Sequence, residues 1–263
     1  MDNAINLKGK NILVTGASQG IGAGICRAVA ACGANVLVNY HLHPEKASAL
    51  VTEIKQEHGI KAFSYGADIT RPDEVTGMFN FFDQSLGSMD ILVNNAGCET
   101  IGEAIYLDLD DWDKVFNVNL RGAFFCAQEA GRRMIRQRRG VIINISSIHD
   151  KVPRKGLIHY CSAKAALNMM TKCLALELAE YNIRVLAVCP GAIETEMNME
   201  EIEKFGKEKF NEWIPLGRLG NTEDIAWTCA FMASDKAAYL TASEIYIDGG
   251  YKENTIPYDP RSK

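Results

Sequence analysis

The sequence lacks every feature that would place it outside the ordinary globular proteins. No run of about 18 apolar residues could span a membrane, and the first ten residues lack the apolar stretch of a secretion signal. The eight cysteines form no Cys-x-x-Cys pair and no cluster with histidine at metal-ligand spacing. We therefore predict a cytoplasmic protein with free thiols, no disulfides and no metal.

An excess of positive charge is also lacking. The chain carries 28 basic and 33 acidic residues, a formal net charge of −5, which argues against nucleic acid or an anionic membrane as partner. One local exception is a basic run at Arg132, Arg133, Arg136, Arg138 and Arg139. We interpret this run as the solvated end of a helix, where cations complement the helix dipole.

Short β-branched apolar runs alternate with stretches of helical periodicity along the whole chain. The predicted strands are residues 11–15, 35–40, 61–65, 91–94, 141–146, 184–189 and 244–248. The predicted helices are residues 21–32, 44–57, 72–86, 111–138, 160–180 and 222–233. This alternation predicts an α/β fold: a Rossmann-type, doubly wound, parallel seven-stranded sheet with helices on both faces.

No linker or composition shift divides the chain, so we expect a single domain over residues 1–263. The segment that breaks the rhythm is 194–219, which is longer than a simple connection and contains Phe205, Phe210 and Trp213. We predict that it forms a lid over a substrate site, although a packed helix pair would have the same composition.

A glycine-rich turn joins the first strand to the first helix. Residues 15–22 read Thr-Gly-Ala-Ser-Gln-Gly-Ile-Gly. In this context the glycines permit a tight turn and close approach of the backbone to a pyrophosphate at the helix N-terminus. The turn therefore predicts a bound dinucleotide.

The second strand indicates which dinucleotide is bound. An Asp or Glu at its end would accept hydrogen bonds from the ribose hydroxyls of NAD, but the strand ends at Asn39, Tyr40 and His41. The missing carboxylate favours NADP, with NAD still possible. Gln19 and His41 occupy positions where an Arg or Lys would bind a 2′-phosphate better, so the side chains left to contact it are Ser18, His41, His43 and Lys46.

Candidate catalytic groups occur at the start of the fifth predicted helix and at the end of the fifth strand. Tyr160 and Lys164 are four residues apart and so share a helix face, where an ammonium would lower the pKa of the phenol. Ser147 follows the strand and would lie at the ligand-binding edge of the sheet. Together they predict proton transfer to or from a substrate oxygen.

These motifs, in this order, resemble the classical short-chain dehydrogenase/reductase family over essentially the whole chain. The matching segments are residues 15–22, Asp68 within 66–69, 94–97, Asn119 within 119–122, Ser147, Tyr160 with Lys164, and 190–195. The resemblance implies hydride transfer between NAD(P) and a secondary alcohol or ketone.

The resemblance also implies individual roles. Tyr160 would be the acid/base, Ser147 would hold the substrate oxygen, Lys164 would bind the nicotinamide ribose, and Asn119 would hold a water that relays protons. Asp68 would meet the adenine. The predicted cofactor-binding residues are Gly16, Ser18, Gln19, Gly20, Ile21, Gly22, Asn39, Tyr40, His41, Asp68, Ile69, Asn95, Ala96, Gly97, Tyr160, Lys164, Pro190, Gly191, Ile193 and Thr195.

Within the family the nearest resemblance is to bacterial glucose 1-dehydrogenases, through residues 38–40, 94–99, 146–149, His159 and 190–195. The predicted substrate-binding residues are Glu99, Ser147, His149, Tyr160 and Trp213. A sugar is thus the first expectation. A hydroxysteroid, a 3-oxoacyl thioester docked through the basic run, and a non-catalytic NADP-binding regulator are the alternatives.

The carboxyl-terminal residues 251–263 follow the last predicted strand and contain Pro257, Tyr258 and Pro260. Comparable tails of the family pack across a subunit interface, so the resemblance implies a homotetramer. An oligomer would also cover the exposed edge strand.

Overall fold

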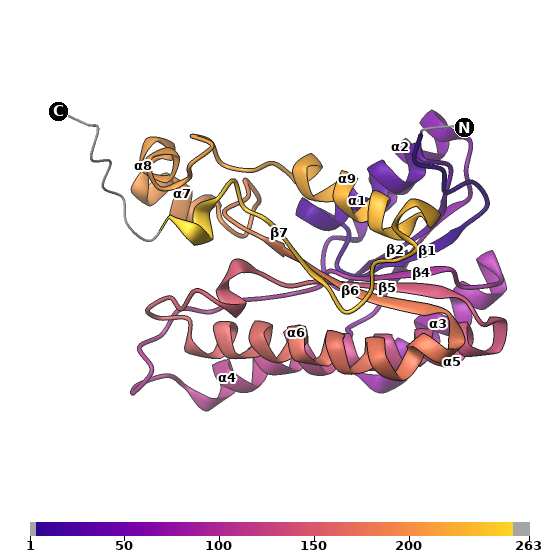
Figure 1. Ribbon diagram of the computed structural model, residues 1–263, viewed down its shortest axis with the longest axis horizontal. Coiled ribbons are helices and arrows are strands. Elements are labelled where there is room, and N and C mark those ends of the chain that lie inside the picture. The colour runs from indigo at the N-terminus through magenta and orange to yellow at the C-terminus, as the bar shows by residue number, and fades with distance from the viewer. Residues whose placement is uncertain (1–3, 255–263) are drawn as a thin grey trace.

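A computed structural model describes residues 4–254 and contains one seven-stranded sheet (Figure 1). The order is β3-β2-β1-β4-β5-β6-β7, and every neighbouring pair is parallel. The strands are β1 Asn11–Val14, β2 Asn35–Tyr40, β3 Ala62–Gly66, β4 Ile91–Asn94, β5 Gly140–Ile145, β6 Ile183–Pro190 and β7 Glu244–Ile247. The predicted doubly wound fold is confirmed, with β7 at one edge.

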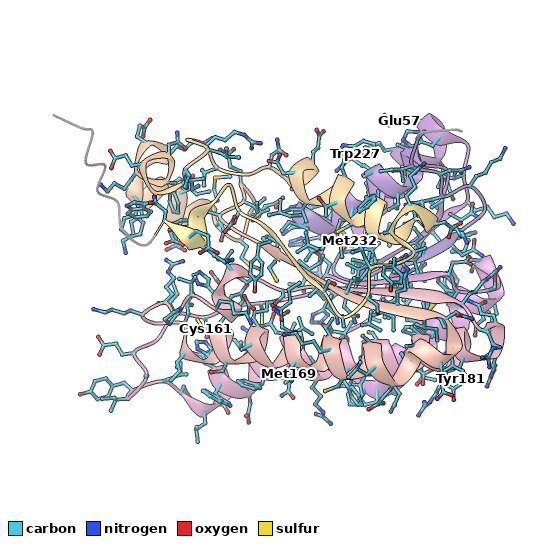
Figure 2. The ribbon with its side chains drawn as sticks, in the orientation of Figure 1. Glu57, Cys161, Met169, Tyr181, Trp227 and Met232 are labelled. Carbon is cyan, nitrogen blue, oxygen red and sulfur yellow. The ribbon has the colours of Figure 1, made fainter. Side chains whose placement is uncertain are left out.

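Helices cover both faces of the sheet (Figure 1). On one face lie α1 Gly20–Ala31, α2 Pro44–His58 and α9 Thr222–Ala233. On the other lie α3 Pro72–Leu86, α4 Leu109–Phe116, α5 Ala123–Gln137 and α6 Ile158–Leu178. Each layer between helices and sheet is filled by apolar side chains, among them Met232 of α9 (Figure 2). Burial on both faces explains why the strand sequences are almost continuously apolar.

A chain of polar side chains crosses this apolar interior. Asn94 and Asn144 are opposite each other in the β4–β5 register, and Asn94 Nδ2 donates to Asn144 Oδ1 at 2.9 Å. Asn144 Nδ2 donates in turn to Thr171 Oγ1 on α6 at 2.8 Å. The chain links the centre of the sheet to the helix that carries Tyr160 and Lys164.

The predicted helix 111–138 is interrupted. Between α4 and α5 the backbone is π-helical over Asn117–Gly122. The Asn119 side chain explains the interruption, because its Nδ2 donates to the Val115 carbonyl at 3.0 Å and occupies the acceptor that a backbone N–H would use in an α-helix. The sequence prediction missed this local competition.

The segment predicted as a lid contains two short helices, α7 Met199–Phe205 and α8 Lys207–Trp213, which lie beyond the carboxyl edge of the sheet (Figure 1). A small apolar cluster holds them, formed by Ile202, Phe210, Ile214 and Leu219. Within residues 4–254, no helix is both long and apolar enough to cross a membrane. The predicted interface tail lies largely outside the described residues.

Candidate active site

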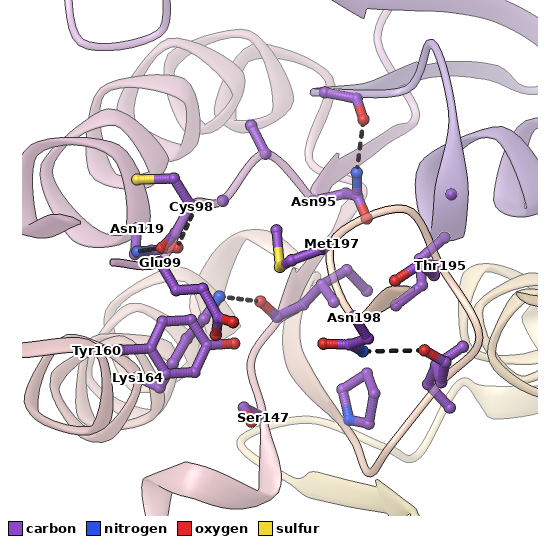
Figure 3. Close-up of a pocket in the computed structure, with 18 of the residues that line it drawn as sticks. Asn95, Cys98, Glu99, Asn119, Ser147, Tyr160, Lys164, Thr195, Met197 and Asn198 are labelled. Carbon is purple, nitrogen blue, oxygen red and sulfur yellow. Dashed lines mark hydrogen bonds between the residues drawn. The ribbon is translucent and has the colours of Figure 1, made fainter. Parts of the chain in front are cut away.

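The carboxyl ends of β1, β2, β4, β5 and β6 border a cleft of about 1170 Å³ (Figure 3). The four predicted catalytic residues line it. So do the predicted substrate residues and all predicted cofactor residues except Gly22 and Tyr40. Gly22 packs under the turn, and the Tyr40 ring packs against Gly66, so neither lies on the cleft wall. This edge of an open α/β sheet is where ligands bind in such folds.

The glycine turn is held by side chains from two neighbouring strands. Asn39 Oδ1 accepts from the Gly16 N–H at 3.1 Å, while Asn95 Nδ2 donates to the carbonyls of Thr15 and Gly16, each at 2.9 Å. Thr15 Oγ1 accepts from the N–H groups of Asn95 and Ala96. The turn is therefore rigid before any ligand arrives.

Close packing explains why two positions of this turn are glycine. Gly16 has φ +59°, and a Cβ there would lie 2.7 Å from Ala96 Cα. A Cβ at Gly22 would lie 2.5 Å from Asn95 Nδ2. Gln19, the N-cap of α1, makes no side-chain hydrogen bond to the helix, so the first N–H groups of α1 remain available to an anion. This cradle fits a dinucleotide pyrophosphate.

Next to the β2 end of the cleft lies Lys46, one of several side chains that the sequence offered as a contact for a 2′-phosphate. Lys46, in the first turn of α2, donates to Gln19 Oε1 at 2.5 Å and so lies against the glycine turn. His41 and His43 line the same end of the cleft. Asn39 is buried and fully occupied with backbone groups, so its role here is to shape the turn.

Ser147, Tyr160 and Lys164 converge at the other end of the cleft (Figure 3). Ser147 Oγ accepts from the His149 N–H at 3.1 Å, and its hydroxyl is near enough to Tyr160 to lower the pKa of that phenol. Lys164 Nζ donates to the Ile145 carbonyl at 2.9 Å and lies 5.5 Å from the centroid of the Tyr160 ring. Two hydroxyls and an ammonium thus face one small volume.

The electrostatics of this group differ from the sequence prediction. Burial raises the pKa of Tyr160, the charge of Glu99 raises it further, and the neighbouring Ser147 hydroxyl lowers it. Lys164 lies by the ring face and bonds a carbonyl, so the lowering of the Tyr160 pKa by Lys164 stays a prediction, and burial is the largest effect on that pKa. Burial also lowers the pKa of Lys164 to about 8.

Asn119 holds the adjoining loop. Its Nδ2 donates to the Cys98 carbonyl at 2.6 Å and its Oδ1 accepts from the Cys98 N–H at 3.2 Å. A Cβ at Gly97 would lie 2.7 Å from that oxygen, which explains the glycine. The Asn119 side-chain amide is thus hydrogen-bonded to backbone groups of Cys98 and Val115. A water relay to Lys164 would have to use the remaining acceptor capacity of Oδ1.

The predicted substrate residues surround Tyr160. Glu99 lies beside the Tyr160 ring (Figure 3), and burial raises the pKa of its carboxyl. His149 Nδ1 lies 2.8 Å from the Val152 carbonyl, so this nitrogen carries the proton, and burial lowers the pKa of the ring. A neutral His149 therefore offers Nε2 as a hydrogen-bond acceptor. Trp213 closes the cleft from α8.

Sequence reasoning missed Arg154 and Glu201. They form an ion pair between the loop before α6 and helix α7, and both line the cleft. Arg154 also lowers the pKa of Glu99, against the larger effect of burial. Neither residue belongs to a motif, and 47 positions separate them in the chain, so no local pattern could have paired them.

The basic run does not belong to this site. Arg133 pairs with Asp83 and Glu129, and Arg139 pairs with Asp90. The run ends α5 and precedes β5, so it lies at the amino edge of the sheet, opposite the cleft. The interpretation as a helix end is therefore supported, and a thioester docked there would not reach Tyr160.

Comparison with known proteins agrees with this geometry. Residues 16–252 match a family model described as enoyl-(acyl carrier protein) reductase. Three curated relatives carry different names. They are 3-oxoacyl-[acyl-carrier-protein] reductase FabG of Staphylococcus aureus (43% identity over 92% of this chain and 97% of the relative), 3beta-hydroxysteroid dehydrogenase 1 of Eggerthella lenta (38%, 93% and 94%) and glucose 1-dehydrogenase 2 of Bacillus subtilis (35%, 93% and 95%).

A solved structure of a short-chain type dehydrogenase/reductase from Mycobacterium marinum superposes with a TM-score of 0.89 at 37% identity, covering 94% of this chain and 97% of that one. Fold and cleft define an oxidoreductase that uses a nicotinamide dinucleotide. The chain belongs to the short-chain dehydrogenase/reductase family. The relatives' differing activities leave its substrate to be argued from the site.

Proposed function

We propose that this protein interconverts a secondary alcohol and its ketone with NADP, and that a neutral sugar is the alcohol. The observation that carries the proposal is the convergence of Ser147, Tyr160 and Lys164 at one end of a cleft whose other end is the glycine cradle. Such a cleft brings an alcohol carbon to the nicotinamide end of an extended dinucleotide. A purely regulatory NADP-binding protein would have no use for this hydroxyl pair.

The residues of this chain would act on the substrate oxygen. The bound nicotinamide supplies the hydride acceptor for alcohol oxidation and the hydride donor for ketone reduction. In the oxidative direction Tyr160 acts as the base after its own proton has left to solvent: the phenolate takes the hydroxyl proton, while the Ser147 hydroxyl donates to the developing alkoxide. In the reductive direction Tyr160 returns the proton to the same oxygen. Lys164 holds the cofactor ribose beside them.

NADP is favoured by Lys46, which lies against the glycine turn through its contact with Gln19. Replacing Lys46 with alanine removes an ammonium that lies against the glycine turn, so the KM for NADP should rise about tenfold while the KM for NAD is unaffected. Steady-state kinetics with both cofactors measure the effect. Lys55→Ala, a cation further along the same helix, serves as the control, and equal losses for both cofactors would remove Lys46 from phosphate recognition.

A sugar is favoured by the acceptors around Tyr160. Glu99 and the Nε2 of neutral His149 can accept hydrogen bonds from substrate hydroxyls, and Arg154 can donate. The lid contributes the aromatic wall formed by Phe205, Phe210 and Trp213, on which the apolar face of a sugar ring or a steroid could pack. Because the polar side chains of Glu99, His149 and Arg154 line the cleft around Tyr160, we favour a sugar over a steroid as the substrate.

The decisive experiment follows nicotinamide absorbance with D-glucose, other sugars, a panel of hydroxysteroids and a 3-oxoacyl thioester. Rapid turnover of one sugar supports the proposal. Turnover of a steroid or a thioester with silence on every sugar overturns it and makes the lid aromatics the specificity element.

Glu99→Gln should raise the KM of a sugar substrate about tenfold or more, because a hydrogen bond to a charged acceptor is lost. It should also move the pH profile of oxidation to lower pH, since the Glu99 charge raises the pKa of Tyr160. Kinetics across pH measure both effects. Glu103→Gln, exposed on the same loop, is the matched control. An unchanged KM would exclude Glu99 from substrate binding.

We further propose a cytoplasmic homotetramer built from one domain with 194–219 as its lid. All eight cysteines are free, which suits a reducing compartment. Large apolar side chains remain exposed on outer helix faces, namely Met169 and Leu176 on α6 and Trp227 and Phe231 on α9. Such faces, with the β7 edge, are candidates for burial between subunits.

A further inference from the structure

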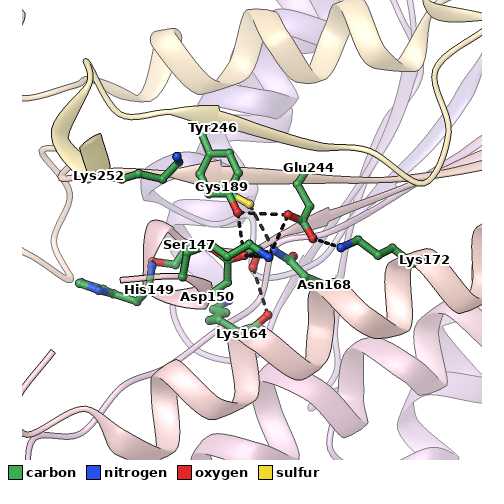
Figure 4. Close-up of polar contacts among 12 residues, drawn as sticks. Ser147, His149, Asp150, Lys164, Asn168, Lys172, Cys189, Glu244, Tyr246 and Lys252 are labelled. Carbon is green, nitrogen blue, oxygen red and sulfur yellow. Dashed lines mark hydrogen bonds and ion pairs between the residues drawn. The ribbon is translucent and has the colours of Figure 1, made fainter. Parts of the chain in front are cut away.

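Asp150 is a buried carboxylate that the chemistry proposed above does not use. It ends the 3₁₀ turn Ile148–Asp150, which directly follows β5 and has Ser147 as its N-cap. Its side chain is 1% exposed. Burying a carboxylate costs free energy unless the charge is hydrogen-bonded or paired, so its partners show what it contributes (Figure 4).

The partners of Asp150 come from two other elements. Its Oδ2 accepts from Asn168 Nδ2 on α6 at 2.6 Å and from the Tyr246 hydroxyl on β7 at 2.7 Å. Lys151 Nζ lies 3.6 Å from the same oxygen. One carboxylate oxygen therefore joins the 3₁₀ turn, α6 and the edge strand (Figure 4).

Both groups proposed to act on the substrate oxygen lie on the elements that Asp150 joins. Asn168 follows Lys164 by four residues and Tyr160 by eight, so the three side chains share one face of α6. On the other side, the Asp150 N–H donates to the Ser147 carbonyl at 3.2 Å, and the His149 N–H donates to Ser147 Oγ. The contact between Asp150 and Asn168 thus spans the two sides of the site.

We propose that Asp150 is a positioning residue that fixes Ser147 relative to Tyr160 by clamping the 3₁₀ turn to α6 and β7. The inference rests on the proposed function, because it gives Asp150 a task only if Ser147 and Tyr160 share the substrate oxygen. Misplacement of a reacting group by about 1 Å can lower turnover by roughly 100-fold. The gain in turnover from holding Ser147 in place can therefore offset the free-energy cost of burying the Asp150 carboxylate.

The outer part of the network neutralises that charge. Glu244 on β7 lies 3.2 Å from the Tyr246 hydroxyl, whose single proton serves the closer Asp150, and it pairs with Lys172 Nζ at 2.7 Å. Lys151 Nζ lies 3.4 Å from Glu244. Burial raises the pKa of Glu244, but the opposing effect of Lys172 and Lys151 is larger and keeps this pKa below its usual range. Two ammonium groups thus serve two carboxylates, which suits a fixed structural link.

The test compares Asp150→Ala and the milder Asp150→Asn with Asp90→Asn. Asp90 is another buried carboxylate that accepts a backbone N–H, but it lies at the amino end of β4, away from the cleft. With the alcohol that the wild type turns over, we expect kcat of Asp150→Ala to fall about 10- to 100-fold. The alcohol KM and the NADPH dissociation constant should stay within about threefold.

The pH profile gives a second readout, one that a purely structural role would not change. Displacing the Ser147 hydroxyl weakens an interaction that lowers the pKa of Tyr160, so the profile of alcohol oxidation should move to higher pH in both Asp150 variants. The other groups facing Tyr160 are Glu99, Cys98, Cys161, Lys164 and His149. The first four are not altered, and His149, which shares the 3₁₀ turn, is kept neutral by burial and so adds no charge to the shift. Asp90→Asn should keep the wild-type kcat and profile even if its melting temperature falls.

Two results would overturn the clamp. The first is that the Asp150 variants have the same kcat and pH profile as Asp90→Asn. The second is that kcat, the alcohol KM and cofactor affinity all worsen equally, which would indicate local unfolding. If Asp150→Ala does not fold, Asp150→Asn and Tyr246→Phe, which each keep the side-chain volume, carry the test. Tyr160→Phe is assayed in parallel. If Tyr160→Phe keeps its turnover, the proposed function is refuted. This result differs from failure of the clamp, in which only the Asp150 variants behave like the wild type.

Discussion

Replacing Tyr160 with phenylalanine should lower turnover by about 10³-fold or more while leaving cofactor binding unchanged. The substitution removes the only hydroxyl proposed to exchange a proton with the substrate, and general acid/base catalysis contributes roughly 10² to 10⁴-fold. Because the ring is retained, its packing against Lys164 and His149 should persist. Nicotinamide absorbance measures turnover, and fluorescence titration with NADPH measures binding.

A tyrosine outside the site provides the control for that experiment. Tyr65 on β3 packs its ring on Phe81 at 5.0 Å between centroids, remote from the reacting groups. Tyr65→Phe should keep full turnover. If Tyr160→Phe retained more than about a tenth of the wild-type kcat, another group would have to be the acid/base.

Lys164→Met should abolish most activity and yet stabilise the fold. A pKa lowered from 10.5 to about 8 by burial means that the charged lysine destabilises the folded state by roughly 3 kcal/mol near neutral pH. Methionine removes this penalty but leaves the Ile145 carbonyl without its donor, so we expect a net gain of about 1–2 kcal/mol. Chemical denaturation measures the gain, and kcat should fall by about 10²-fold or more.

The pH dependence of that gain has a definite sign. Between about pH 8 and 10.5 the unfolded chain holds the Lys164 proton more tightly than the folded chain, so wild-type stability rises with pH in this window. The advantage of Lys164→Met should therefore be largest below pH 8 and shrink towards pH 10. A constant advantage across this range would mean that burial does not perturb Lys164.

The fold was predictable because its determinants are local. Strand and helix periods repeat along the chain, and the parallel order follows from right-handed crossovers. The π-helical segment was not predictable from period, because it depends on the Asn119 amide competing for the Val115 carbonyl. The predicted strand 61–65 was also one residue early, an error of the size expected at element ends.

The site was predictable wherever a motif marked it. The glycine turn and the residues Ser147, Tyr160 and Lys164 occur in recognisable contexts, and the structure brings them to one cleft. Arg154 with Glu201, and Asp150 with Tyr246, are contacts between segments far apart in sequence. The electrostatics were equally hidden, since burial, and not the spacing of Tyr160 and Lys164, dominates both pKa values.

The amide pair at the centre of the sheet bears on how the chain finds its register during folding. β4 and β5 are almost wholly apolar, so a two-residue slip between them would still match apolar faces. The slip would, however, separate Asn94 from Asn144 and bury both amides without each other, at about 1–3 kcal/mol per unpaired group. The two asparagines therefore select one alignment of the strands whose carboxyl ends build the site, and they penalise misfolded sheets that hydrophobicity alone would tolerate.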